Sequence, residues 1–476
     1  MQRVDEILNY MATPALFKKR EIKVGKRSAV VAFNPDLTDG FALRHIIEGL
    51  MGCEQKFNSL YALAEIALLA SESQVVYSKD EATKGILTGD VVIVVEGLDG
   101  YLVANARKWD KRAVAEPPTE TVMRGPREGF IEDLKTNLSL LERRLKSPAF
   151  AVERFKIGRI SSTDVALVYI STVAQPSLVE KVRKKLKSID IDALVDSHYL
   201  QPLIEPYPRS IFHQTGVNEK PDVIVAKILE GRVAIIVDGS PMVLTVPFVL
   251  VEDFQSGEDY YERHSFASFL RILRCFSIII GILLPGLYVA LQTFHYDVIP
   301  LRFLVTLMNA VKDIPLTPLP EVLFVLLLFE IIREASVRMP RAVGMAMSIV
   351  GALVLGDTAV KAGIISSPAV MIIALSSIAL YTVPNEVGTM SLLRIIFTVM
   401  GGLTGLYGLM VTTLIILHML VCLDSFGTSY LAPIAPLVPS DLKDAITRQP
   451  MFALKNRPKT IPNINATRQG DNNNGK

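Results

Sequence analysis

ILTGDVVIVVEG (residues 86–97) recurs in this chain as ILEGRVAIIVDG (residues 228–239), at an offset of 142. The two stretches align without a gap and are identical at seven of twelve positions, with both glycines among the matches. In each copy an apolar run leads through a turn rich in Gly and Asp into a second apolar run, as in a β-hairpin. The repeat predicts a duplicated unit in which residues 91–95 and 233–237 form equivalent strands.

Each copy also contains an earlier apolar strand followed by helix-like stretches, which is typical of a small sheet covered by helices. The expected fold class is therefore α/β plus α-helical membrane, with two tandem similar α/β cytosolic subdomains followed by a polytopic helical transmembrane domain. The expected limits are 1–123 for subdomain 1, 124–150 for a linker helix, 151–262 for subdomain 2, 263–423 for the transmembrane domain and 424–476 for a polar cytoplasmic tail.

The density of charged residues falls at the expected boundary between the cytosolic subdomains and the transmembrane domain. Residues 1–262 hold 70 charged side chains, whereas residues 263–423 hold only 17. The formal net charge of +2 argues against a nucleic-acid binder, and the mean hydropathy of +0.36 favours a membrane protein. Three cysteines (Cys53, Cys275 and Cys422) lie far apart, so they indicate neither a disulfide framework nor a zinc site.

The apolar region predicts four spans, at about 268–294, 318–333, 364–384 and 395–423, with five or six as alternatives. Two shorter segments, 299–311 and 342–361, carry charges or several glycines and are expected to be re-entrant or pore-lining. The N-terminus has no continuous apolar core of a signal peptide. Arginines cluster in the loop at 333–341, and the tail is basic, so both termini are expected to be cytoplasmic.

Sequence motifs of catalysis are absent: there is no Gly-rich nucleotide loop, no HExxH and no GxSxG pattern. We therefore expect no enzyme, no catalytic residue, no cofactor and no metal site. Ionisable residues inside the apolar region are stronger candidates for function, because placing each charged side chain in hydrocarbon costs ~3 kcal/mol. The candidate membrane-edge ion pairs, from their i,i+3 and i,i+4 spacing, involve Glu330, Arg333, Glu334 and Arg338.

Asp357 and Lys361 are also spaced i,i+4, within a Gly-rich segment. They either line a polar path or form a buried structural pair, and the residues alone leave both readings open. Small residues there let helices approach closely around an axis. The candidate pore-lining or intramembrane polar residues are Gly351, Val354, Gly356, Asp357, Val360 and Lys361.

Several long stretches, in order and correctly spaced, resemble the A-subunit family of bacterial spore germination receptors, the GerA family. They are RGPREGF (124–130), GRVAIIVDGSPMVLTVP (231–247), FQSGEDYYER (254–263), IIREASVRMPR (331–341), SIVGALVLGDTAVKAGIISSP (348–368) and SFGTSYLAP (425–433). The chain departs from the family at residues 307–319, which lack the usual Ser-Arg-Glu loop, and at Lys361, where an acidic residue is more usual.

The resemblance implies a multi-pass protein of the spore inner membrane with a large cytoplasmic N-terminal domain. It implies homo-oligomers that form a nutrient-gated ion channel, together with a transporter-like B subunit and a lipoprotein C subunit. A non-conducting membrane scaffold and a paralogous sporulation ion-channel subunit of the same family remain alternatives.

Overall fold

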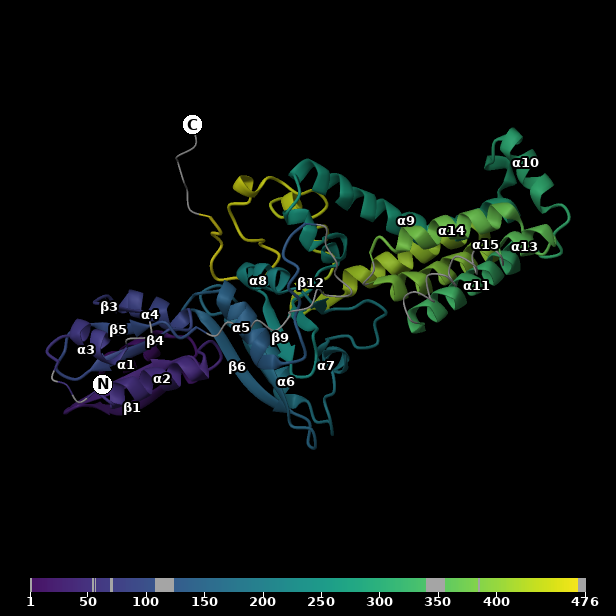
Figure 1. The fold of residues 1–476 in the computed structure, drawn as a ribbon. Helices are drawn as coiled ribbons and strands as arrows, with labels where there is room; N and C mark the ends of the chain where they lie inside the picture. Colours follow the sequence, from purple (N-terminus) through teal and green to yellow (C-terminus); the bar gives the residue numbers. More distant parts are fainter. Residues whose placement is uncertain are drawn as a thin grey trace.

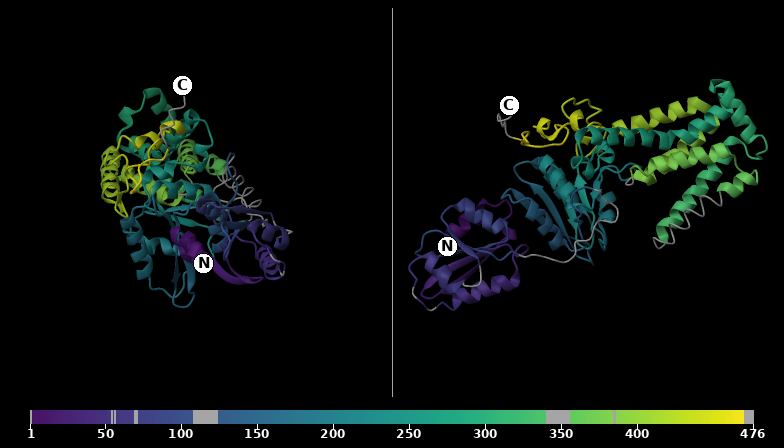
Figure 2. Two further views of the ribbon diagram at one scale, coloured as in Figure 1. Left: turned by 90° about the vertical axis from the view of Figure 1, so that its left-hand side faces the viewer. Right: turned by 45° about the horizontal axis from the view of Figure 1, so that its top comes forward.

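The computed structural model describes residues 2–53, 55, 57–68, 72–107, 124–339, 356–383 and 386–469. Two α/β domains follow one another at one end of the molecule, and a helical bundle extends from the second domain (Figure 1). The C-terminal tail returns to lie beside the second domain and the start of the bundle (Figure 2).

The first α/β domain is one antiparallel sheet with helices on both faces, in the strand order β1-β2-β4-β5-β3. The central strand β4 is VVIVV and is buried on both sides. Val91, Ile93 and Val95 face α2 and α3, while Val92 and Val94 face α1 and α4. The elements are α1 (Gln2–Tyr10), β1 (Lys18–Val24), β2 (Arg27–Phe33), α2 (Gly40–Met51), α3 (Leu60–Ala67), β3 (Ser73–Val76), α4 (Lys79–Leu87), β4 (Val91–Val95) and β5 (Tyr101–Ala104).

The second α/β domain repeats this arrangement element by element, with the strand order β6-β7-β9-β10-β8. Strand β9 (233–237) takes the central place that β4 takes in the first sheet, so the predicted equivalence of the two strands is confirmed. The elements are α5 (Leu134–Arg144), β6 (Phe150–Ile157), β7 (Thr163–Ile170), α6 (Pro176–Ser188), α7 (Ser197–Ile204), β8 (Gly216–Asn218), α8 (Pro221–Glu230), β9 (Val233–Val237) and β10 (Val243–Val246).

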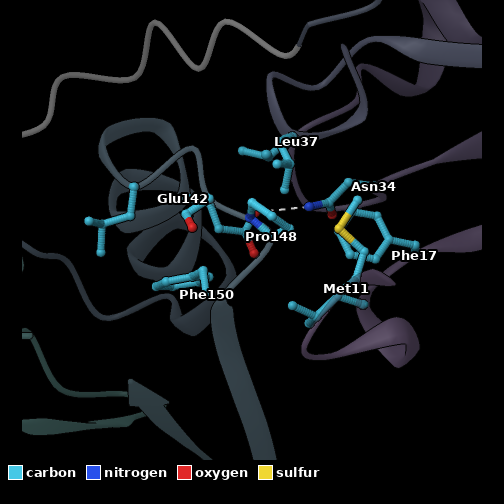
Figure 3. Close-up of a pocket in the computed structure, with 11 residues that line it drawn as sticks. Met11, Phe17, Asn34, Leu37, Glu142, Pro148 and Phe150 are labelled. Atoms are coloured by element: carbon cyan, nitrogen blue, oxygen red, sulfur yellow. Dashed lines mark hydrogen bonds between the residues drawn. The ribbon is translucent and has the colours of Figure 1, made fainter. Parts of the chain in front are cut away.

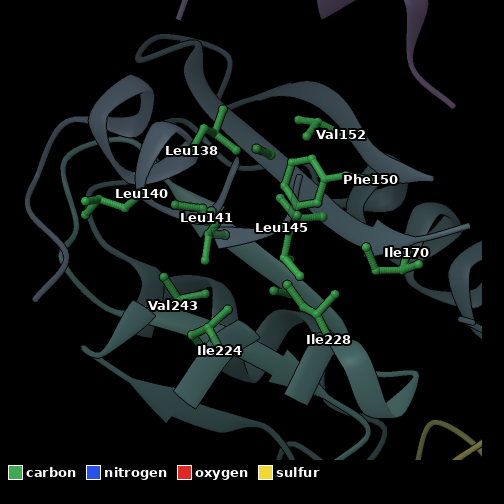
Figure 4. Packing of buried hydrophobic residues seen from close by; sticks show 14 of the residues in the cluster. Leu138, Leu140, Leu141, Leu145, Phe150, Val152, Ile170, Ile224, Ile228 and Val243 are labelled. Carbon is green, nitrogen blue, oxygen red and sulfur yellow. The ribbon is translucent and has the colours of Figure 1, made fainter. Parts of the chain in front are cut away.

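Helix α5 lies within the stretch expected to be a linker helix, and it packs on the second sheet. Leu138 and Leu141 of α5 meet Phe150 of β6 and Ile228 of α8 in one buried cluster (Figure 4). This cluster covers the face of β9 that carries Ala234 and Ile236, and α1 covers the matching face of β4. Helix α5 is therefore the counterpart of α1.

The two α/β domains meet where β2 ends and α5 passes (Figure 3). The Asn34 side chain donates to buried Glu142 over 2.9 Å, and Arg154 forms a 2.9 Å ion pair with Asp36. Apolar residues, including Phe150, surround a cavity of about 10 Å³, which is room for one water. Burial and the charge of Asp36 raise the pKa of Glu142 to about 8.

The bundle contains two described helices that are long and apolar enough to cross a membrane, α9 and α15. Helix α11 carries five ionisable residues, and α14 has only 14 residues, so neither meets that standard. Helix α10 lies at the far end of the bundle with Leu307 as its buried residue. The bundle helices are α9 (His264–Phe294), α10 (Leu301–Val311), α11 (Pro318–Arg338), α13 (Gly356–Lys361), α14 (Ser367–Leu380) and α15 (Val387–Cys422).

Helix α15 differs from the single span expected at 395–423, because it reverses at Gly405. Gly405 has φ 66° and ψ −147°, which is a glycine conformation outside any helix. A Cβ atom on Gly408 would lie 2.5 Å from the carbonyl oxygen of Met400, whereas eight residues of straight helix would separate them by about 12 Å. The two arms form an antiparallel hairpin, 387–404 and 406–422, whose first arm touches α9 where Gly401 meets Gly286.

Candidate functional site

The core of the bundle contains a charged side chain that ties three helices together. Arg394 of α15 is only 2% exposed. Its guanidinium donates to the Glu330 carboxylate of α11 over 2.7 Å and to the hydroxyls of Ser377 and Ser376 of α14 over 2.9 and 3.2 Å. A buried arginine needs such partners, since an unpaired charge there would be strongly destabilising. Together the contacts fix the relative positions of α11, α14 and α15.

The four residues expected to pair by their i,i+3 and i,i+4 spacing form two separate ion pairs. Arg333 pairs with Glu330 at 2.5 Å and donates to the Ser391 hydroxyl over 2.8 Å, so it faces inward. Arg338 pairs with Glu334 at 2.5 Å on the exposed side of the helix. Glu330 therefore forms ion pairs with both Arg333 and Arg394. Arg394 has no such signal in the sequence, because it stands just before an apolar run and has no charged neighbour along the chain.

Glu321, near the start of α11, is deeply buried. It is 1% exposed, and its carboxylate accepts the main-chain N–H of Ser366 over 2.5 Å. Ser366 itself caps α14 by accepting from the N–H of Ala369. A carboxylate at a helix N-terminus offsets unsatisfied amide groups there. Glu321 therefore joins α11 to the start of α14.

Four of the six candidate pore-lining residues lie on or at the start of α13, and Gly351 and Val354 lie outside the described residues. Lys361 pairs with Asp357 at 2.6 Å, and their side chains are 75% and 55% exposed. The pair is therefore not a buried structural pair within one chain. Helix α13, with Gly356 and Val360, lies at the bundle end farthest from the α/β domains (Figure 1).

At the opposite end, the FQSGEDYYER stretch joins the base of α9 to the tail. Arg271 is 0% exposed and binds Asp259 at 2.8 Å and Asp444 at 2.9 Å, and Arg274 also reaches Asp259 at 2.9 Å. Burial opposes the ionisation of Asp259, but the hydrogen bonds from Arg274 and Arg271 prevail and lower its pKa. The carboxylate that anchors α9 to the domain therefore stays charged at neutral pH.

Both ends of the α15 hairpin also contact the second α/β domain. Thr389, in the first arm, donates to the carbonyl of Ile211 over 3.1 Å. After the second arm, Ser425 accepts from the N–H of Phe248 over 2.9 Å. Tyr430 packs between the rings of Phe212 and Phe248. Movement of the second domain is thus directly linked to both arms of α15.

Within the described ranges no three His, Cys, Asp or Glu side chains gather as a metal site would require. These residues form ion pairs that connect the bundle helices to one another and to the tail. One further ion pair is exposed at the end of the bundle.

Comparison with known proteins gives one consistent family. The model of the family described as "Bacillus/Clostridium GerA spore germination protein" matches residues 5–460. Spore germination protein KA of Bacillus subtilis (strain 168) is 38% identical over 459 residues, which cover 95% of this chain and 84% of that protein. Spore germination protein GerLA of Bacillus cereus is 37% identical over 384 residues, or 80% of this chain and 78% of that protein.

A solved structure, the N-terminal domain of the A subunit of the Bacillus megaterium spore germinant receptor GerK3, matches 51% of this chain and 91% of that chain, with 27% identity and a TM-score of 0.40. The sequence matches alone span nearly the whole chain, and they lead to a family of receptor subunits that is not a known family of enzymes. The chain belongs to the GerA family, the A-subunit family of the spore germination receptors.

Proposed function

We propose that this protein is the membrane subunit of a nutrient-sensing germination receptor and that its copies assemble into a nutrient-gated ion channel. In this proposal the bundle crosses the spore inner membrane several times, and both α/β domains and the tail lie in the cytoplasm. Its partners are a transporter-like B subunit, which holds the nutrient, and a lipoprotein C subunit.

The surface of the bundle supports placement in a membrane. Helices α9 and α15 expose many large apolar side chains, which water would penalise and lipid or a second copy would accept. Examples are Phe276, Ile279, Leu403, Tyr407, Leu414 and Ile415. The α/β domains contact both ends of the α15 hairpin, so a membrane-crossing hairpin would leave these domains on one side.

The exposed Asp357–Lys361 pair is the observation that carries the channel proposal. Each of these groups would cost ~3 kcal/mol in hydrocarbon, so their exposed side chains require water or another subunit. A ring of copies would bring several such pairs around one axis, which is a common source of ion selectivity. We place α13 at the mouth of the path; residues 342–355, also expected along it, lie outside the described residues.

Single-channel recording tests this proposal. The full chain, assembled with its partner subunits in a planar bilayer, should give discrete current steps. Lys361→Gln should shift the cation-to-anion permeability ratio toward cations, because it leaves the carboxylate uncompensated. Val360→Ser should raise the unstimulated current.

Ile373→Ser is the control, because Ile373 is fully buried against α11 and should affect stability without opening a path. If the assembled complex gives no current steps, the protein acts as a scaffold. If Ile373→Ser leaks while Val360→Ser stays tight, the path lies elsewhere.

A further inference from the structure

A cavity of about 260 Å³ lies between the second α/β domain and the C-terminal tail, beside the end of α8. The domain side includes Glu230, Arg232 and Glu252, and the tail side includes Arg457 and Arg468. The cavity is slightly smaller than the ~300–1,000 Å³ pockets that hold drug-sized ligands. Its occupant is therefore expected to be a small molecule.

The floor of this cavity is a buried ion network. Arg232, only 6% exposed, pairs with Glu230 at 2.7 Å and with Glu252 at 3.1 Å. Lys227 pairs with Glu252 from the other side at 2.9 Å. The Nε–H of Arg232 has no acceptor among the described residues. A buried donor of this kind is destabilising unless a ligand or water accepts from it.

The wall formed by the tail carries two arginines, Arg457 and Arg468. Arg457 donates to the carbonyls of Leu229 and Asn465 over 2.6 and 3.0 Å. In the described part of the chain, neither Arg457 nor Arg468 has a carboxylate within ion-pair distance. Burial and the like charge of Arg468 lower the pKa of Arg457, although Glu230 opposes the effect. Arg457 also donates through Nη1 to the carbonyl of Thr467, so among the described residues its Nη2 group and the Arg468 guanidinium are the groups left to bind an anion.

The whole lining has an excess of positive charge. Asp444 is already bound by Arg271, and Asp441 accepts the N–H of Thr460 over 2.7 Å. The lining contains six cations, Arg232, Lys443, Lys455, Arg457, Lys459 and Arg468, against four carboxylates, Glu230, Glu252, Asp441 and Asp444. Because Glu252 and Asp444 are also bound from outside the lining by Lys227 and Arg271, the lining has an excess of positive charge that suits an anion.

We propose that this cavity binds a small anion through carboxylate or phosphate oxygens, with Arg457 and Arg468 as its principal donors and Arg232 beneath it. Guanidinium groups are suited to this task because their N–H groups match the two oxygens of a carboxylate or phosphate. Binding would hold the tail against the domain. Through Asp444 and Arg271 it would also stabilise the base of α9.

Titration of the full chain in detergent with sodium phosphate, sodium succinate and glycine tests the proposal, with ionic strength held constant by sodium chloride. Isothermal calorimetry should show saturable binding of phosphate or succinate. Comparing the two titrations shows whether the site prefers a phosphate or a carboxylate group. Glycine, which has no net charge, should not bind. Arg468→Gln should weaken binding about tenfold, the loss expected for one charged hydrogen bond.

The matched control is Arg20→Gln, which removes an exposed arginine on β1 outside the cavity and should bind like the wild type. Lys459→Gln, at an exposed position of the lining, provides a second test if Arg468→Gln proves unstable. The proposal is overturned if neither anion binds beyond the chloride control, if glycine binds equally well, or if a folded lining variant binds both anions with wild-type affinity. These readouts do not depend on ion conduction.

Discussion

The two α/β domains share one strand order but differ in what surrounds them. The first domain packs its sheet between two apolar clusters and touches the rest of the chain through α5 and β6. The second domain also contacts the tail, the base of α9 and both ends of α15. After duplication, therefore, the same fold can serve as an outer domain in one copy and as the connection to a helical bundle in the other.

The largest effect should come from breaking that connection. Arg271→Met removes the cation that buried Asp259 shares with partly exposed Asp444 and leaves Asp259 with Arg274 alone, and we expect a loss of about 3–5 kcal/mol in unfolding free energy. Urea unfolding in detergent measures the loss, and proteolysis should cut the tail faster. The control is Arg3→Met in the first domain, whose exposed ion pair with Asp99 should contribute less than about 1 kcal/mol. Equal losses of unfolding free energy in the two variants would contradict the different roles of the two domains.

Because the two α/β domains share one fold, equivalent substitutions in their cores should cost a similar amount of stability in each domain. Ile93 of β4 and Ile235 of β9 occupy matching positions and are both 0% exposed. Each Ile→Ala change should cost about 2–5 kcal/mol in its own domain. Hydrogen exchange with mass spectrometry resolves the two domains. Only Ile235→Ala should also raise exchange in α9 and the tail, and a similar rise with Ile93→Ala would contradict the division of roles.

Contact between the two domains should depend on pH. The pKa of Glu142 rises from the usual 4.5 to about 8 on folding, so the folded chain holds a proton that the unfolded chain releases. Its contribution to stability is fully present below about pH 4.5 and is lost as pH rises through about 8.

Glu142→Gln keeps an acceptor for Asn34, and at pH 9 it should stabilise the chain by on the order of 3 kcal/mol relative to the wild type. Thermal unfolding from pH 5 to 9 is the measurement. A wild-type curve that stays parallel to the variant across this range would mean that Glu142 does not titrate near 8.

The smallest effect concerns the surface contact between the same domains. Arg154→Ala removes the 2.9 Å pair with Asp36, and we expect a loss of about 0.5–1 kcal/mol that shrinks at high salt. Urea unfolding at 0.05 and 1 M sodium chloride measures it. A loss that is large and independent of salt would point to packing instead of charge.

The sequence revealed the repeat only where identity survived. The offset of 142 holds from β4 to β9 and from β5 to β10, but β1 begins 132 residues before β6. Insertions between these points hide the relation of α1 to α5, since two amphipathic helices share a pattern without sharing residues. A search by element order would have found it.

The arrangement of the bundle helices was harder to predict, because amino-acid composition does not show where the chain reverses. Gly405 reverses α15 inside an apolar run, and hydropathy alone cannot distinguish one long helix from two short ones. Starting the predicted span at 395 also left out Arg394, the residue that binds α11 and α14. Spacing along one helix found Glu330 with Arg333, whereas contacts between helices had no sequence signal.

The arrangement of the chain across a membrane can be tested by labelling with a membrane-impermeant maleimide from outside. The native cysteines Cys53, Cys275 and Cys422 are replaced by serine, and single cysteines are introduced as Lys361→Cys on α13 and Lys455→Cys in the tail. Both positions are exposed, at opposite ends of the bundle. The account predicts strong labelling at position 361 and none at position 455 until the membrane is permeabilised. Labelling at 455 in intact membranes, with 361 protected, would contradict it.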